Sequence, residues 1–230
     1  MRYALSVLIL PAFLWLPPAL AQDNEAEKLF RDAEKKIKAA TAIQVDVDMS
    51  MEGKGVKFKG SLLLTKDHKA KVTMTGQVDG KEFKVETISN GTRMRTSQTF
   101  LPDPKESETP KQFHNMLSAM TSRVGLVGIF FISSKKDMEK ETDVEKLIPI
   151  SEFKLEAAEK VGGRDAKVIS YQAAPAGEKP ARITLWLDAK TLLPLKRVIA
   201  PPRESERITE TYTEFKLNPK VDAKVFELTK

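Results

Sequence analysis

The amino-acid sequence predicts a mainly β protein with a few helices (α+β), in which an antiparallel sheet of about eleven strands curls into an incomplete barrel. Hydrophobic and polar residues alternate in one short segment after another, a pattern typical of strands that bury one face. Two-residue turn signals, Asp79-Gly80 and Asn90-Gly91, separate some of these segments. Helical periodicity is confined to residues 24–40 and to an insert. We therefore expect these helices to cover the apolar face of the sheet.

The N-terminal residues 1–21 have the pattern of a secretory signal peptide. Arg2 precedes an apolar stretch, and Ala19-Leu20-Ala21 is a small-residue cleavage motif followed by polar residues. The apolar stretch is broken by Pro11 and is shorter than the roughly 20 residues that span a bilayer. We expect export with cleavage after Ala21, which leaves residues 22–230 as one domain. A retained N-terminal anchor is the alternative.

Composition limits the class of protein. The chain has no cysteine, so we expect neither disulfides nor a lipid anchor on the exported domain, and we predict a soluble monomer. A formal net charge of +6 favours anionic membrane headgroups or acidic protein partners. Aromatic residues are sparse and the lysines are spread along the chain, which argues against nucleic acid as a partner.

The predicted strands place their apolar residues on one face. Five segments between residues 45 and 98 form a meander, and a one-residue shift of the first would bury Asp46 and Asp48. Residues 182–188 alternate in the same way. We expect the inward side chains to line an apolar ligand-binding cavity. They are Val47, Met49, Met51, Phe58, Leu62, Met74, Phe83, Val85, Met94, Ile183, Leu185 and Leu187.

Residues 99–150 interrupt the strand pattern and are expected to form a helical insert. Pro102 and Pro104 mark a loop, an N-cap threonine followed by proline begins a helix over 109–124, and a weaker helix is expected over 137–148. The side chains expected to form a lid over the cavity are Phe113, Met116, Leu117, Met120, Phe130 and Phe131. Methionine side chains adapt to differently shaped partners. Methionines occur both on the first strands and on the helix expected to cover them, which favours a contact between sheet and helix that can open. Ordinary core packing is the alternative.

The sequence lacks the patterns of common catalytic and metal sites. His68 and His114 are its only histidines, and neither has further metal ligands at a familiar spacing. The chain has no G-x-S-x-G motif, no cysteine nucleophile and no glycine-rich phosphate loop after a strand. Asp46 and Asp48 share a strand face, where solvated carboxylates are a simpler interpretation than a calcium or acid–base site. We expect a protein that is not an enzyme, with no metal and no cofactor.

The last third of the chain has the most specific pattern. Residues 183–228 read I-x-L-W-L-D-x-x-T-x-L-P-L-K-R and then Y-T-E-F-x-x-N-x-x-V-D-x-x-V-F-x-L, and we expect strands up to its final segment, Val225–Leu228. This order resembles the C-terminal half of the periplasmic outer-membrane lipoprotein carriers, the LolA/LolB-like superfamily. The resemblance extends over most of the chain as an order of elements. It implies a curled sheet around an apolar cavity, with helices across the open side.

The resemblance implies a periplasmic carrier or holdase that binds the acyl chains of lipoproteins or lipids under a movable lid. A membrane-protein donor or acceptor would be a transient partner. In the best-studied carriers an arginine on an early strand holds the lid shut through backbone carbonyls. Residues 56–66 of this chain offer Lys57 and Lys59 on the outward face and no arginine, while Arg93 and Arg95 lie several strands later. The alternative function is an envelope-stress sensor that binds a membrane protein. A third function, a secreted hydrolase, is not supported, because the sequence has no recognisable nucleophile motif or metal ligand set.

Overall fold

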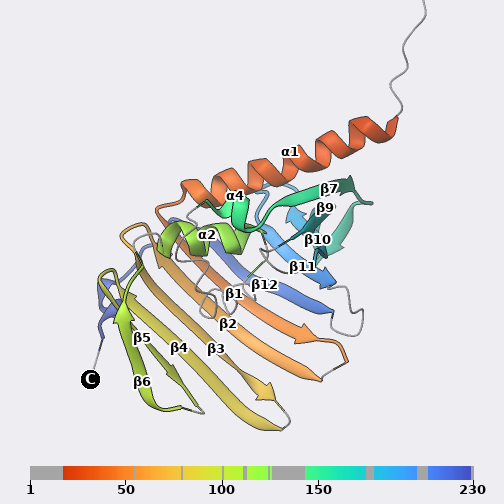
Figure 1. The fold of residues 1–230 in the computed structure, drawn as a ribbon. Helices are drawn as coiled ribbons and strands as arrows, with labels where there is room; N and C mark the ends of the chain where they lie inside the picture. The colour runs from red at the N-terminus through yellow and green to blue at the C-terminus, as the bar shows by residue number, and fades with distance from the viewer. Residues whose placement is uncertain are drawn as a thin grey trace, which may run out of the picture.

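One antiparallel sheet of twelve strands organises the molecule (Figure 1). The computed structural model describes residues 18–53, 55–78, 80–99, 101–110, 113–123, 125, 143–174, 179–200 and 207–228. Within them the strand order is β6-β5-β4-β3-β2-β1-β12-β11-β10-β9-β7, and β8 pairs with β9. The strands are β1 Ala42–Met51, β2 Val56–Thr65, β3 Lys69–Val78, β4 Lys81–Asn90, β5 Arg93–Gln98, β6 Leu101–Glu108, β7 Ile150–Leu155, β8 Glu159–Val161, β9 Arg164–Ala173, β10 Ala181–Asp188, β11 Pro194–Ala200 and β12 Ile208–Leu217.

The alternation in the sequence sets the two faces of the sheet. In β1, Val45, Val47 and Met49 are buried, whereas Asp46 and Asp48 point to the other side. The sheet curls around the buried face, which we call the concave face, and the opposite side is the outer face. The predicted curled sheet covered by helices is therefore confirmed.

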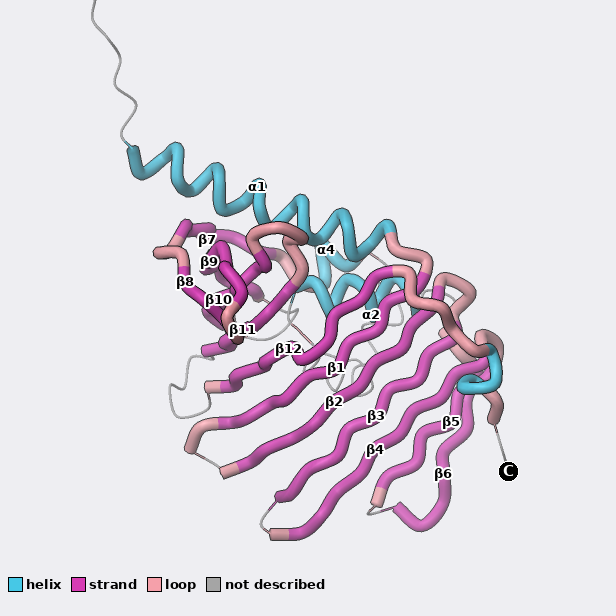
Figure 2. The backbone as a smooth tube through the Cα atoms, turned by 180° about the vertical axis from the view of Figure 1, so that it is seen from behind, coloured by secondary structure: helices cyan, strands magenta, loops and turns pink. Residues whose placement is uncertain are grey.

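The helices lie on the concave side (Figures 1 and 2). Helix α1, Pro18–Ala39, crosses one end of the sheet, while α2, Phe113–Arg123, and the short α4, Val144–Leu147, lie within the bend. The predicted helix over 24–40 thus forms part of a longer one. None of the helices described here combines the length and the apolar character needed to cross a membrane.

The predicted loop at Pro102 and Pro104 is wrong, because these residues belong to strand β6. Among the described residues β6 is the edge strand and pairs with β5 alone. Proline lacks an N–H donor and is tolerated in a strand at a sheet edge, where one side of the strand needs no partner. The prolines are therefore compatible with a strand that the alternating pattern does not reveal.

Two further segments differ from the prediction. The last one is a 3₁₀ helix, η3 Ala223–Phe226, instead of a strand; Asp222 caps it and Phe226 is buried where η3 contacts β3 and β4. Residues 150–161 form two strands, β7 and β8, and Glu152, with a positive φ of 54°, lies where the register of β7 with β9 shifts. Of the helix expected over residues 137–148, α4 is described, and residues 137–142 lie outside the described residues.

The turn after β10 is stabilised by Asp188, the aspartate of the L-W-L-D motif. Its Oδ1 accepts hydrogen bonds from Thr191 N at 2.8 Å and Lys190 N at 3.0 Å, and its Oδ2 pairs with Arg164 Nη2 at 2.7 Å. Burial opposes ionisation of this carboxyl, but the hydrogen bonds from Thr191 and Arg164 outweigh burial and lower its pKa from 3.8 to about 2. The ionised form therefore stabilises the folded state.

Replacing Asp188 with Asn should lower the free energy of unfolding by about 1–2 kcal/mol near neutral pH, because charge-assisted hydrogen bonds are lost. The folded pKa lies below the unfolded pKa, so this contribution is complete above the unfolded pKa and disappears as the pH falls through about 2. Urea unfolding at several pH values measures the difference. Asp165→Asn, at an exposed pair with Lys160, is the control. A difference between wild type and Asp188→Asn that does not vary with pH would contradict this assignment.

Candidate functional site

The structure divides the predicted cavity residues between two apolar clusters. Val47, Met49, Leu62 and Met74 belong to a cluster beneath α2, which we call the α2 cluster, with Phe58, Phe83 and Met94 packed at its margin. Met51 and Val85 are half-buried on the same strands. The predicted cavity residues on β1 to β5 are Val47, Met49, Met51, Phe58, Leu62, Met74, Phe83, Val85 and Met94. The remaining three lie on β10, in a cluster beneath α1.

Ile183, Leu185 and Leu187 lie in the second cluster, which we call the α1 cluster. It includes Phe30 of α1 and Tyr171 of β9. The three β10 side chains are at most 2% exposed. They are packed as ordinary core.

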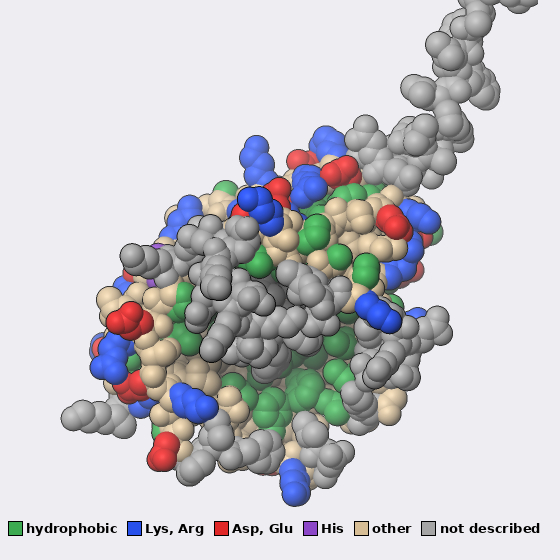
Figure 3. All heavy atoms as spheres, in the orientation of Figure 1, with side chains coloured by type: hydrophobic (Ala, Val, Ile, Leu, Met, Phe, Trp, Pro, Cys, Tyr) green, Lys and Arg blue, Asp and Glu red, His purple; other side chains and the backbone are tan. Residues whose placement is uncertain are grey.

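The α2 cluster opens toward the end of the sheet that lies away from α1. Phe58 and Phe83 are half-buried there, with ring centroids 5.2 Å apart in an edge-to-face arrangement. Met94 on β5 is also half-buried. Figure 3 shows hydrophobic side chains gathered in a hollow on this face of the molecule. We call the surface formed by Phe58, Phe83 and Val85 the apolar hollow; Met94 pairs with Ser89, nearer the other end of β4.

Gly76 makes room for the two phenylalanines. It lies between them in the ladder, paired with Phe58 on β2 and with Phe83 on β4. A Cβ atom at this position would come within 2.6 Å of Phe58 Cδ1 and would also collide with the carbonyl oxygen of Lys57. The absence of a side chain therefore allows the two rings to meet across β3.

Three of the side chains predicted to form a lid lie in or against the α2 cluster. Phe113 and Leu117 of α2 are buried in it, and Met116 is partly buried against both clusters. Met120 lies in α2, but its side chain is not described, and Phe130 and Phe131 fall outside the described residues. Helix α2 thus places apolar side chains over the inner strands.

The C-terminal end of α2 is fixed to the sheet by a buried arginine. Arg197 of β11 is 0% exposed, and its Nη1 and Nη2 donate to the carbonyl oxygen of Thr121 at 3.2 and 3.1 Å. Nη2 also donates to the carbonyl oxygen of Ser122 at 3.1 Å. Glu210 of β12 lies 3.6 Å from Nη1 and accepts a hydrogen bond from the Tyr212 hydroxyl at 2.5 Å. A cation at a helix C-terminus satisfies the last carbonyls and interacts favourably with the helix dipole.

A second buried arginine fixes the same helix end to other elements. Arg123 Nε donates to Glu34 Oε1 of α1 at 2.8 Å, and its Nη1 donates to the carbonyl oxygen of Ile148 at 2.6 Å. The Tyr171 hydroxyl donates to the carbonyl oxygen of Arg123 at 2.6 Å. Burial raises the pKa of Tyr171 to about 12, so the hydroxyl remains a donor at physiological pH.

Gly125 allows this close approach. Its φ is 77°, in the left-handed region that favours glycine after a helix. A Cβ atom there would collide with the carboxylate of Glu210 and the guanidinium of Arg197. The backbone after α2 therefore lies directly against the buried ion pair.

The sequence analysis missed Arg197 and Glu210. Both occupy inward positions and pair with each other across β11 and β12, while Arg197 also pairs with Leu185 of β10. A signal was present, since Arg197 is two residues before the inward Ile199 and shares its strand face. The arginine that contacts the covering helix comes from a late strand, whereas the resemblance directed attention to an early one.

The described residues contain no group of three or more His, Cys, Asp or Glu side chains that could hold a metal ion. His68 lies in the turn between β2 and β3, and His114 is buried in α2.

Comparisons with known proteins identify the fold. Lipoprotein LppX from Mycobacterium tuberculosis aligns with a TM-score of 0.51 and 13% identity, covering 87% of this chain and 99% of LppX. LprF from Mycobacterium bovis aligns with a TM-score of 0.52 and 12% identity, covering 86% of this chain and 96% of LprF. A LolA superfamily protein from Nitrosomonas europaea aligns over 88% of this chain and 97% of its own at 11% identity, with a TM-score of 0.35 that is too low to argue from.

No family model matches the chain, and the search of curated proteins found no relative. The similarity to LppX and LprF therefore rests on structure, and it shows that this chain shares their fold.

The buried pair should behave as a unit in unfolding experiments. Removing one partner leaves the other as a buried charge without this counter-charge, so Arg197→Met and Glu210→Met should each cost about 3–5 kcal/mol. The double variant should cost about 1–3 kcal/mol less than the sum of the two. Urea unfolding measures all four proteins. The exposed pair of Lys28 and Asp32 is the control, where the effects of the two single substitutions should add. Additive effects at Arg197 and Glu210 would show that the charges do not depend on each other.

Proposed function

We propose that this protein is a periplasmic carrier or holdase that binds the acyl chains of lipoproteins or lipids in the apolar hollow, under a movable cover that includes α2. The observation that carries the proposal is the kind of side chain at the margins of the two clusters. The partly buried residues at the margin of the α1 cluster are aliphatic residues and a methionine, such as Ile150 and Met116, whereas the α2 cluster ends in the paired half-buried rings of Phe58 and Phe83. Apolar surface of this kind on an otherwise polar sheet marks a site for an apolar ligand.

The energetics favour an acyl chain as the ligand. Burying one methylene contributes about 0.8 kcal/mol of favourable free energy. An acyl chain laid along Phe58, Phe83 and Val85 would bury its own surface and that of these side chains. The signal-peptide pattern that ends at Ala21 supports export to the periplasm. Membrane-protein donors or acceptors would be transient partners.

The cover must give way for a ligand to bind. Phe113 and Leu117 occupy the α2 cluster, so we propose that they compete with the acyl chain and that uptake displaces them. The hydrogen bonds to the C-terminal end of α2 hold the cover in place, and we propose that the bond from Tyr171 breaks when the cover opens. Met116 is one of the side chains that would repack, together with Met120, Phe130 and Phe131 as predicted members of the cover.

Replacing Phe58 or Phe83 with Ala should weaken the binding of a fluorescent fatty acid about tenfold, since each ring contributes about 1.5 kcal/mol of apolar contact. Fluorescence titration measures the affinity. Leu63→Ala is the matched control, because Leu63 is a half-buried apolar residue on the other face of the same strand. Unchanged affinity in both phenylalanine variants would exclude the apolar hollow as the binding site.

Removing a hydrogen bond from the fixed end of α2 should make the cover easier to open. Tyr171→Phe loses the bond to the carbonyl oxygen of Arg123, which contributes about 1 kcal/mol, so fatty-acid uptake should be about fivefold faster. Stopped-flow fluorescence measures the rate. Trp186→Phe is the control, because it removes a hydrogen bond to Glu159 at 2.7 Å that involves no residue of α2. Equal uptake by wild type and Tyr171→Phe would contradict a cover attached at this end.

A further inference from the structure

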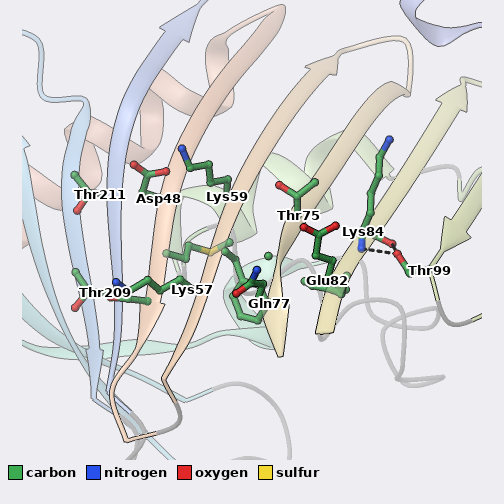
Figure 4. Close-up of a pocket in the computed structure, with 15 residues that line it drawn as sticks. Asp48, Lys57, Lys59, Thr75, Gln77, Glu82, Lys84, Thr99, Thr209 and Thr211 are labelled. Carbon is green, nitrogen blue, oxygen red and sulfur yellow. Dashed lines mark hydrogen bonds between the residues drawn. The ribbon is translucent and has the colours of Figure 1, made fainter. Parts of the chain in front are cut away.

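A second hollow lies on the outer face of the sheet (Figure 4). It is a groove of about 810 Å³ formed by β12, β1, β2, β3 and β4. Two rows of outward side chains border it, and they follow from the strand register. One row runs from Asp48 through Lys59 and Thr75 to Lys84, and the other includes Lys57. We call this surface the outer groove.

The lysines of the outer groove are available for an external partner. Lys57, Lys59 and Lys84 are exposed and form no ion pair within the described residues. Farther along the same face, Lys71 is paired with Glu86 at 3.6 Å. The carboxylates of Asp48 and Glu82 also border the groove. The groove therefore presents three unpaired ammonium groups and two carboxylates.

The outer groove and the apolar hollow lie back to back on the same strand ends. Lys57 and Lys59 flank Phe58 in β2, and Glu82 and Lys84 flank Phe83 in β4. Successive side chains of a strand point to opposite faces, so the strands are apolar inside and charged outside at this level. This end of the sheet lies away from α1 (Figure 1).

We propose that this end of the sheet docks on an anionic phospholipid surface, with Lys57, Lys59 and Lys84 facing the headgroup phosphates. The inference rests on the proposed function, because an acyl chain that leaves a membrane for the apolar hollow must pass the headgroups beside it. Lysines on β2 and β4 are about two strand spacings apart, roughly 10 Å. A surface that carries phosphates at many positions matches this spread of point charges.

Each lysine near an anionic surface contributes about 1 kcal/mol, which is about fivefold in affinity. Replacing all three with Gln should therefore weaken binding to phosphatidylglycerol vesicles about 100-fold. Co-sedimentation of the whole exported domain with the vesicles measures binding, and phosphatidylcholine vesicles show the dependence on headgroup charge. The matched control replaces Lys35, Lys190 and Lys224 with Gln; these lysines are exposed and lie outside the groove, and the change in net charge is the same.

Removing negative charge from the groove should have the opposite effect. Asp48→Asn and Glu82→Gln should each strengthen binding to phosphatidylglycerol vesicles about fivefold. If these side chains had only a structural role, their replacement would lower the affinity for the vesicles or leave it unchanged.

The docking proposal is overturned if the three groove lysines can be replaced without effect, or if the control variant loses as much affinity. Binding of polyglutamate in place of vesicles would also overturn it and would assign the groove to an acidic protein segment. Fatty-acid binding by the same variants keeps the two proposals apart. It should be unchanged when the groove lysines are replaced, and its absence in the wild type would reject the carrier function whatever the vesicles show.

Discussion

The buried guanidinium of Arg197 is the interaction on which the arrangement of helix and sheet depends. It joins β11 to Glu210 of β12 and to the last carbonyls of α2, so one side chain connects the middle of the sheet to its cover. A buried charge is stable when it is paired and hydrogen-bonded, and costly when it is not. The position of α2 is therefore set by polar contacts at one end, and its apolar residues need not fix it alone.

The two clusters of the concave face are packed with different kinds of side chain. Beneath α1 the rings of Phe30, Phe153 and Tyr171 lie 4.9 to 5.8 Å apart in tilted or edge-to-face contacts, an arrangement with strong geometric preferences. Beneath α2 the packing relies on methionines such as Met74 and Met94, whose flexible side chains fill irregular space. The two halves of a single sheet are therefore packed with different kinds of side chain.

The strands between residues 42 and 98 could be predicted from the sequence because their alternation is regular and their turns carry glycine. Strand β6 could not be predicted, because its prolines indicate a loop. Proline is tolerated there since the outer side of an edge strand needs no N–H donors. The apolar members of the site follow from the same alternation. The alternation does not predict that Leu185 and Met49 lie in separate clusters, since that depends on which helix covers each strand. The role of Arg197 depends on the register of β11 with β12, which joins residues that no sequence motif connects.

An open sheet exposes unpaired backbone at its margins, where further chains can add as strands. Here the two edge strands carry features that hinder such growth. Strand β6 contains Pro104 and exposed charged residues, and β7 is distorted where Glu152 adopts a positive φ. The molecule can thus keep an open sheet and still resist assembling into continuous β-ribbons with its own copies.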